Sequence, residues 1–180
     1  MGESHVVITF DKPVVAGLSM LTSRVSHLCP SPLRGKGLVH PTSYHLTAYY
    51  GFCSSVGPAA IQSWLDQEFS TQVHLRPTAL LPHPSGNSNC WAVRVESFGL
   101  LRLHECLRDH PLSFEPAYKH YLPHISLGWF RPHFDLRHFP PAVDPFGPEG
   151  ALGSLVKQDR LECWFVDGAT KAATQLFLRN

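Results

Sequence analysis

The alternation of apolar and polar residues predicts where the helices and strands of this chain lie. Apolar residues recur at helical spacing in three segments, about 13–28, 58–69 and 98–108, which we predict to be amphipathic helices. Short runs rich in β-branched and aromatic residues predict strands. They occupy about residues 5–10, 44–50, 73–81, 90–95, 122–130, 161–166 and 174–178. Elements in this order predict an α+β fold with mainly antiparallel strands.

Three segments lack this periodicity, and we predict them to be loops. Residues 29–43 contain three prolines and two glycines, residues 82–89 are a polar connection between two strands, and residues 131–149 contain five prolines. Clusters of proline, glycine and small polar residues are typical of loops. A loop as long as the last one is usually functional or mobile in a compact domain.

Two of the predicted strands carry a histidine two residues before a hydroxyl residue, in His45-Leu-Thr47 and His124-Ile-Ser126. Residues i and i+2 of a strand point to the same face, so each histidine shares a face with its hydroxyl residue. The aliphatic residue between them faces the core. If the two strands lie side by side, two imidazoles and two hydroxyls meet in one cleft. Tyr49 continues the alternation of the first triplet and is therefore predicted to line the same cleft.

The His-x-Ser/Thr triplet is short, and it occurs four times in the chain. The triplets at His40 and His83 have proline in the middle, which lacks an amide donor and belongs in loops or edge strands. Only His45 and His124 lie in apolar runs. Each triplet alone is also compatible with a half-buried structural histidine, and the duplication is what favours a functional site.

Two histidines and two hydroxyls around one phosphate are sufficient to cleave a phosphodiester. A base must deprotonate the attacking oxygen and an acid must protonate the leaving oxygen, and histidine titrates near neutral pH. Hydroxyl and imidazolium donors neutralise the phosphate charge. The rival use of clustered histidines is metal binding, but the chain lacks H-E-x-x-H and has no carboxylate at ligand spacing beside either triplet. We predict no metal and no other cofactor.

The pair of triplets resembles the signature of the two-histidine (2H, LigT-like) phosphoesterase superfamily, which carries one His-x-Ser/Thr in each half of a pseudo-twofold α+β domain. The resemblance implies one two-lobed domain over residues 1–180, with mainly antiparallel sheets flanking a central cleft and helices outside. It also implies that His45 and His124 are the acid–base pair and that Thr47 and Ser126 bind the phosphate. Which histidine is the base stays open.

Two further stretches, residues 119–124 and 156–166, look similar to viral 2′,5′-phosphodiesterases and related enzymes that degrade nucleotide second messengers. Beside Tyr49, the candidates for substrate contact are Lys119, Tyr121 and Arg94. Tyr121 alternates away from His124 along the strand, and for Arg94 a phosphate contact and a solvated position fit equally well.

Composition limits the partners and the location. The 180 residues are 43% apolar and 16% charged, which is typical of a globular chain. The net charge of +1 does not favour a broad grip on long duplex nucleic acid, so a small nucleotide or oligonucleotide fits better. Five scattered cysteines without C-x-x-C predict a reducing, cytoplasmic location. No signal peptide and no membrane span are visible, and we expect a monomer.

The sequence therefore predicts a metal-independent phosphodiesterase that hydrolyses a small 2′,5′-linked messenger, either 2-5A oligoadenylate or a cyclic dinucleotide such as 2′,3′-cGAMP. The resemblance implies a viral protein that evades antiviral immunity. The alternatives are an enzyme that opens 2′,3′-cyclic phosphates or processes RNA ends, a metal-dependent hydrolase, and a catalytically silent nucleotide-binding module. The presence of both complete triplets argues against the silent module.

Overall fold

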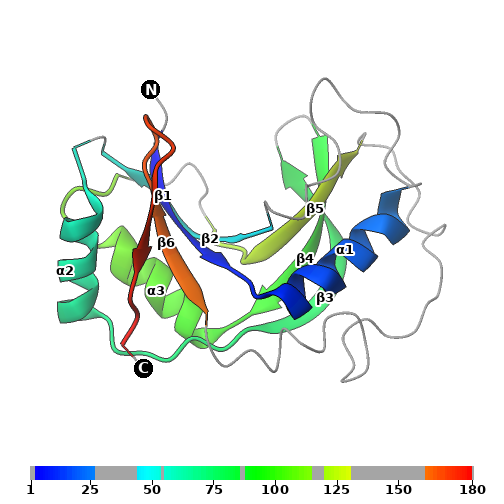
Figure 1. The fold of residues 1–180 in the computed structure, drawn as a ribbon, viewed down its shortest axis with the longest axis horizontal. Helices are drawn as coiled ribbons and strands as arrows, with labels where there is room; N and C mark the ends of the chain where they lie inside the picture. Colours follow the sequence, from blue (N-terminus) through cyan, green and yellow to red (C-terminus); the bar gives the residue numbers. More distant parts are fainter. Residues whose placement is uncertain are drawn as a thin grey trace.

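The fold is known from a computed structural model, which describes residues 3–26, 44–53, 55–85, 88–114, 120–130 and 161–179. These residues contain three helices and seven strands (Figure 1). In chain order they are β1 (Ser4–Thr9), α1 (Lys12–Ser26), β2 (Leu46–Phe52), α2 (Pro58–Glu68), β3 (Arg76–Ser85), β4 (Ser88–Glu96), α3 (Phe98–Arg108), β5 (His124–Phe130), β6 (Glu162–Val166) and β7 (Ala173–Leu176).

The strands form one antiparallel sheet in the order β3-β4-β5-β2-β1-β6-β7, so the predicted α+β class with antiparallel strands is confirmed. Strand β5 begins at His124 and β2 begins at Leu46, directly after His45, and these two strands are neighbours in the middle of this sheet (Figure 1). On one side of them lie β4 and β3, and on the other side β1, β6 and β7. Two segments far apart in sequence therefore meet at a central seam.

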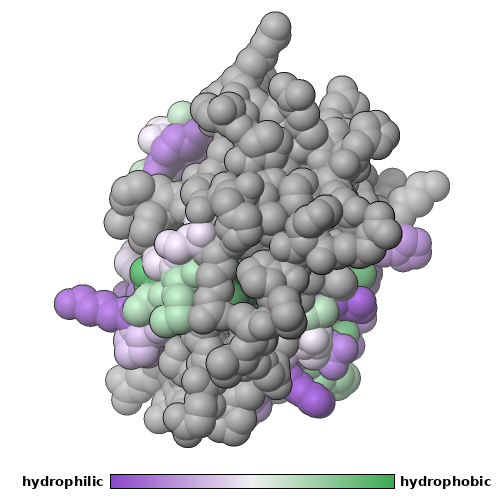
Figure 2. All heavy atoms as spheres, turned by 90° about the vertical axis from the view of Figure 1, so that its right-hand side faces the viewer, coloured by the Kyte–Doolittle hydropathy of each residue, from purple (hydrophilic) through white to green (hydrophobic). Residues whose placement is uncertain are grey.

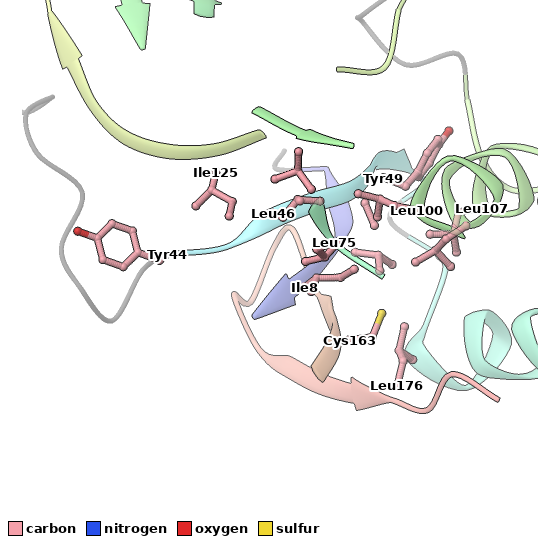
Figure 3. Packing of buried hydrophobic residues seen from close by; sticks show 14 of the residues in the cluster. Ile8, Tyr44, Leu46, Tyr49, Leu75, Leu100, Leu107, Ile125, Cys163 and Leu176 are labelled. Atoms are coloured by element: carbon pink, nitrogen blue, oxygen red, sulfur yellow. The ribbon is translucent and has the colours of Figure 1, made fainter. Parts of the chain in front are cut away.

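The helices supply the core on one face of the sheet. Leu46 of β2 and Ile125 of β5 are fully buried there, together with apolar residues of all three helices. Figure 3 shows Leu46 and Ile125 near Leu100 of α3. Burying one such side chain stabilises the fold by about 1.5–3 kcal/mol. The helical contribution comes from Val14, Leu18, Leu21, Ile61, Leu65, Leu100, Leu103 and Leu107.

The prediction that residues 82–89 form a loop is wrong for most of these residues. Strand β3 continues to Ser85 and β4 already begins at Ser88, with Pro82 opposite Trp91. Proline is tolerated at this position because β3 is the last strand of the sheet. The side of the strand that lacks an amide donor can then face away from the ladder. The predicted loops at 29–43 and 131–149 lie outside the described residues.

The helix predicted over residues 98–108 is confirmed at both ends. It begins after Ser97, whose hydroxyl accepts a hydrogen bond of 3.1 Å from the amide of Leu100. A serine in this position satisfies one of the free amides in the first turn of a helix. The cap is the physical reason that the helix begins at Phe98.

The described surface is chemically mixed. Seen from the side that faces right in Figure 1, it shows both hydrophobic and strongly hydrophilic residues (Figure 2).

Among the described helices, none is both long and apolar enough to span a bilayer. The four cysteines of the described residues, Cys53, Cys90, Cys106 and Cys163, are free.

Gly99 allows α3 to approach the segment that leads into β3. A Cβ atom here would lie 2.1 Å from the carbonyl oxygen of Gln72, so the backbone would have to move. We expect Gly99→Ala to lower the free energy of unfolding by about 1–3 kcal/mol, the usual cost of overpacking, measured by chemical denaturation. Gly57→Ala is the control, because a Cβ there meets nothing within 4 Å. Equal stability of both variants would contradict the close approach.

Candidate active site

The pairing of β2 with β5 brings the two triplets together. Leu46 lies opposite Ile125 in this antiparallel pair, and these are the middle residues of the two triplets. This register, extended by one position on each side, aligns each histidine with the hydroxyl residue of the other triplet. Because Leu46 and Ile125 both face the helices, His45, Thr47, His124 and Ser126 share the opposite face. The structure thus places the two triplets on neighbouring strands, and their joint role stays a prediction.

His124 has a defined tautomer in its neutral form. Its Nδ1 lies 2.8 Å from the carbonyl oxygen of Leu122. A carbonyl only accepts, so Nδ1 carries the hydrogen and Nε2 is the proton acceptor of the neutral ring. Burial lowers the pKa of His124, the Leu122 carbonyl raises it, and the nearby charge of His45 lowers it again. At neutral pH the ring is therefore uncharged and ready to accept a proton.

The two histidines differ in their surroundings. His45 is exposed, whereas His124 is half-buried. Their charges are nevertheless close enough for His45 to affect the pKa of His124. Such a pair of titratable groups in unlike environments suits separate acid and base roles.

Arg94 supplies a positive charge next to His124. The ladder between β4 and β5 pairs Arg94 directly with His124, so both side chains lie on one face of the sheet. The guanidinium is exposed and carries a positive charge. Of the two predicted cations, Arg94 therefore lies at the site, and Lys119 lies outside the described residues.

The prediction that Tyr49 lines the cleft is wrong. Its side chain is 1% exposed and its hydroxyl donates a hydrogen bond of 2.8 Å to the carbonyl oxygen of Phe114. The ring lies 4.8 Å from that of Phe52 and 5.5 Å from that of His104 on α3, among the core residues of Figure 3. Tyr49 is a core residue on the helix side of the sheet.

A β-bulge in β2 explains this inversion. Tyr49 lies opposite Val6 of β1, but Thr47 lies opposite Val7, so Thr47 and Ala48 together face one residue. An extra residue of this kind breaks the alternation of a strand, and a sequence pattern with a period of two cannot show it. Within β2, the aromatic residue on the site face is instead Tyr50, 40% exposed.

Both carbonyl groups of the bulge are bound by one stacked pair of rings. The Tyr121 hydroxyl donates to the carbonyl oxygen of Thr47 at 2.8 Å, and Nδ1 of His104 donates to that of Ala48, also at 2.8 Å. The two rings are 3.9 Å apart and inclined by only 4°. Burial lowers the pKa of His104, against the opposing effect of the Ala48 carbonyl, so the ring is uncharged at neutral pH.

This arrangement corrects the substrate contact predicted for Tyr121. Burial raises the pKa of the Tyr121 hydroxyl above its usual range, so it stays protonated and donates to the backbone of the first triplet. Tyr121 therefore positions Thr47. Nothing in the sequence identified His104, because its position in a helical pattern matches that of any half-buried residue.

A hollow of about 330 Å³ lies beside His45 on the side of β1 and β6. Alternate residues of β1 form its floor, as expected for one face of a strand. The lining consists of His5, Val7, Thr9, Tyr44, His45, Trp164, Val166 and Ala173. Within the part of the chain that the structure describes, no group of three or more His, Cys, Asp or Glu side chains is arranged to hold a metal ion.

Comparison with known proteins adds one finding on the fold. No family model and no curated protein matches the sequence. Among solved structures, the chain is similar to the protein TT0787 of Thermus thermophilus, with a TM-score of 0.58 and 20% sequence identity. The match covers 97% of this chain and 95% of that chain. The two proteins therefore share their fold over nearly their whole length.

The hydrogen bonds from Tyr121 and His104 to the two carbonyl groups of the bulge are called the brace below. Removing the Tyr121 hydroxyl tests it. We expect Tyr121→Phe, which leaves the Thr47 carbonyl without its partner, to lower the free energy of unfolding by about 1–3 kcal/mol. The amide NMR signals of Thr47 and Ala48 should shift.

The matched control is Tyr49→Phe, which loses a hydrogen bond of the same length, 2.8 Å, to Phe114. Its amide shifts should centre on Phe114 and leave the bulge less affected. Unchanged signals at Thr47 and Ala48 in Tyr121→Phe would rule out the brace.

Proposed function

We propose that this chain is a 2H-type phosphoesterase that cleaves a phosphodiester by acid–base catalysis with two histidines. The observation that carries the proposal is the pairing of Leu46 with Ile125, the middle residues of the two triplets. The α+β fold and the resemblance of the two triplets to the superfamily signature support it as well.

In the proposed reaction His124 is the base and His45 the acid. Nε2 of neutral His124 takes the proton from the attacking oxygen, either water or a 2′-hydroxyl of the substrate, as that oxygen bonds to phosphorus. His45 gives its proton to the leaving oxygen as the other P–O bond breaks. Each histidine then returns to its starting state by proton exchange with solvent. Positioned acid–base groups of this kind contribute about 10²–10⁴-fold each.

Three further groups complement the charge of the phosphate. The hydroxyls of Thr47 and Ser126 donate to its non-bridging oxygens, and Arg94 adds a full positive charge beside His124. Donors that are held in place before the reaction stabilise the charge that develops in the transition state. The protein thus provides acid, base and oxyanion donors from its own side chains.

The proposed substrate is a small 2′,5′-linked nucleotide, either 2-5A oligoadenylate or a cyclic dinucleotide such as 2′,3′-cGAMP. The net charge of +1 and the likeness of residues 119–124 and 156–166 to viral 2′,5′-phosphodiesterases support this choice. Destruction of such a messenger would silence an antiviral signal. We propose that the protein acts as a monomer in the cytoplasm.

Turnover of a substrate panel tests the proposal. The panel contains 2-5A, 2′,3′-cGAMP, a 3′,3′-cyclic dinucleotide and an RNA with a 2′,3′-cyclic end, each with EDTA and without added metal. We expect cleavage of a 2′,5′-linked substrate, and a fall of about 10²–10⁴-fold in kcat in both His45→Ala and His124→Ala.

The control for the panel is His74→Ala, because this exposed histidine lies outside the site and its loss should leave turnover unchanged. Cleavage of the cyclic RNA end alone would favour the RNA-processing enzyme. Loss of activity with EDTA would favour the metal-dependent hydrolase. Binding without turnover of any substrate would favour the silent module.

The base role of His124 predicts a particular pH dependence. A base works only when deprotonated, and burial lowers the pKa of His124. The acid limb of kcat/KM should therefore have its midpoint below the ordinary histidine value of about 6.5. An NMR titration of the His124 ring should give the same midpoint, and His45→Gln should raise it because a like charge is removed. A midpoint at or above 6.5 would contradict this assignment.

A further inference from the structure

The hollow between β1, β6 and His45 contains groups that the proposed reaction does not use. Its volume of about 330 Å³ lies at the lower end of the ~300–1,000 Å³ range of small-molecule sites. That size suits one nucleoside, and His45 on its wall places it next to the proposed reaction centre. A ligand in this hollow would therefore lie beside His45.

Trp164 gives the hollow a flat apolar wall. Its Nε1 donates to Oγ1 of Thr9 at 3.1 Å, so the polar edge of the indole is already bonded to the protein. The ring itself lines the hollow together with Val7 and Val166. A flat aromatic surface flanked by aliphatic groups is a stacking platform for a nucleobase.

His5 adds one hydrogen-bond acceptor to this apolar lining. Its Nδ1 lies 3.3 Å from the carbonyl oxygen of Glu3, so Nδ1 carries the hydrogen and Nε2 of the neutral ring accepts. Burial lowers the pKa of His5, and the charges of His45 and Lys171 lower it further against the opposing effect of the Glu3 carbonyl. Tyr50 packs on the ring, with the two centroids 5.3 Å apart. The hydrogen bond from the His5 ring to Glu3 uses Nδ1 and not Nε2.

We propose that this hollow binds the nucleobase of the substrate, with Trp164 stacking on the base and Nε2 of His5 accepting a hydrogen bond from its exocyclic amino group. The proposal rests on the proposed function, because it assigns the same site a nucleotide with an amino-bearing base such as adenine. It goes beyond the two triplets, because it makes β1 and β6 the elements that select the nucleobase of the substrate.

Equilibrium binding tests this assignment without requiring turnover. The probes are adenosine 2′-monophosphate and the 2′-monophosphate of purine riboside, which lacks the amino group, titrated calorimetrically into the full chain. We expect wild type to bind the adenine nucleotide about two- to tenfold more tightly, as is typical of one hydrogen bond. His5→Phe should remove this preference while keeping a ring of similar size.

The stacking wall is tested by Trp164→Leu, which should weaken binding of both nucleotides by about five- to hundredfold. The matched control is Trp64→Leu on α2, a half-buried tryptophan whose Nε1 also donates to the protein, at 2.8 Å to the carbonyl oxygen of Cys106. This variant should keep the wild-type affinity. Thermal unfolding of each variant confirms that it folds.

The outcomes separate this inference from the proposed function. Equal affinity of wild type for the two nucleotides, no binding of either, or unchanged affinity in Trp164→Leu would each overturn the base-binding hollow, even if phosphodiesters are cleaved. Amino-dependent binding that is lost in His5→Phe would support it. The same binding without cleavage of any substrate would contradict the enzyme and leave the hollow as a nucleotide-binding site.

Discussion

The pairing of Leu46 with Ile125 is the constraint on which the rest of the site depends. Both side chains are fully buried, so the hydrophobic core fixes the register between β2 and β5. A slip of either strand by one residue would turn its histidine into the core and its aliphatic residue into the site. The force that folds the sheet is therefore also the force that brings the two triplets together, although they come from distant parts of the chain.

The bulge in β2 lets one strand serve two purposes. Before the bulge, β2 presents polar residues to the site, and after it the strand turns Tyr49 toward α3 and Tyr50 toward the site face. Such a break leaves carbonyl groups without ladder partners, and a buried carbonyl without a partner costs about 1–3 kcal/mol. The stacked rings of His104 and Tyr121 remove that cost, and they hold Thr47 in place from the core side.

The features that depend on local periodicity could be predicted from the sequence. The capped helix over residues 98–108 and the shared face of each histidine with its hydroxyl follow from spacing alone. Three features did not follow from it. The bulge is an irregularity of pairing, the strand character of residues 82–85 depends on β3 being an edge, and the brace by His104 requires a contact between a helix and a strand 56 residues apart. Each is decided by tertiary structure, which single-residue patterns do not contain.

Three histidines of the described residues are placed where burial favours the neutral ring. Burial lowers the pKa values of His5, His104 and His124, so the unfolded chain binds protons at these positions more readily than the folded chain does. Stability is therefore complete above the ordinary value of about 6.5 and falls as pH drops toward the lowered values. In each of the three, Nδ1 donates to a backbone carbonyl, which fixes the tautomer. For His5 and His124 on the site face, this hydrogen bond leaves Nε2 as the acceptor of the neutral ring. The same kind of backbone contact therefore orients both the proposed catalytic base, His124, and the residue proposed to bind the nucleobase, His5.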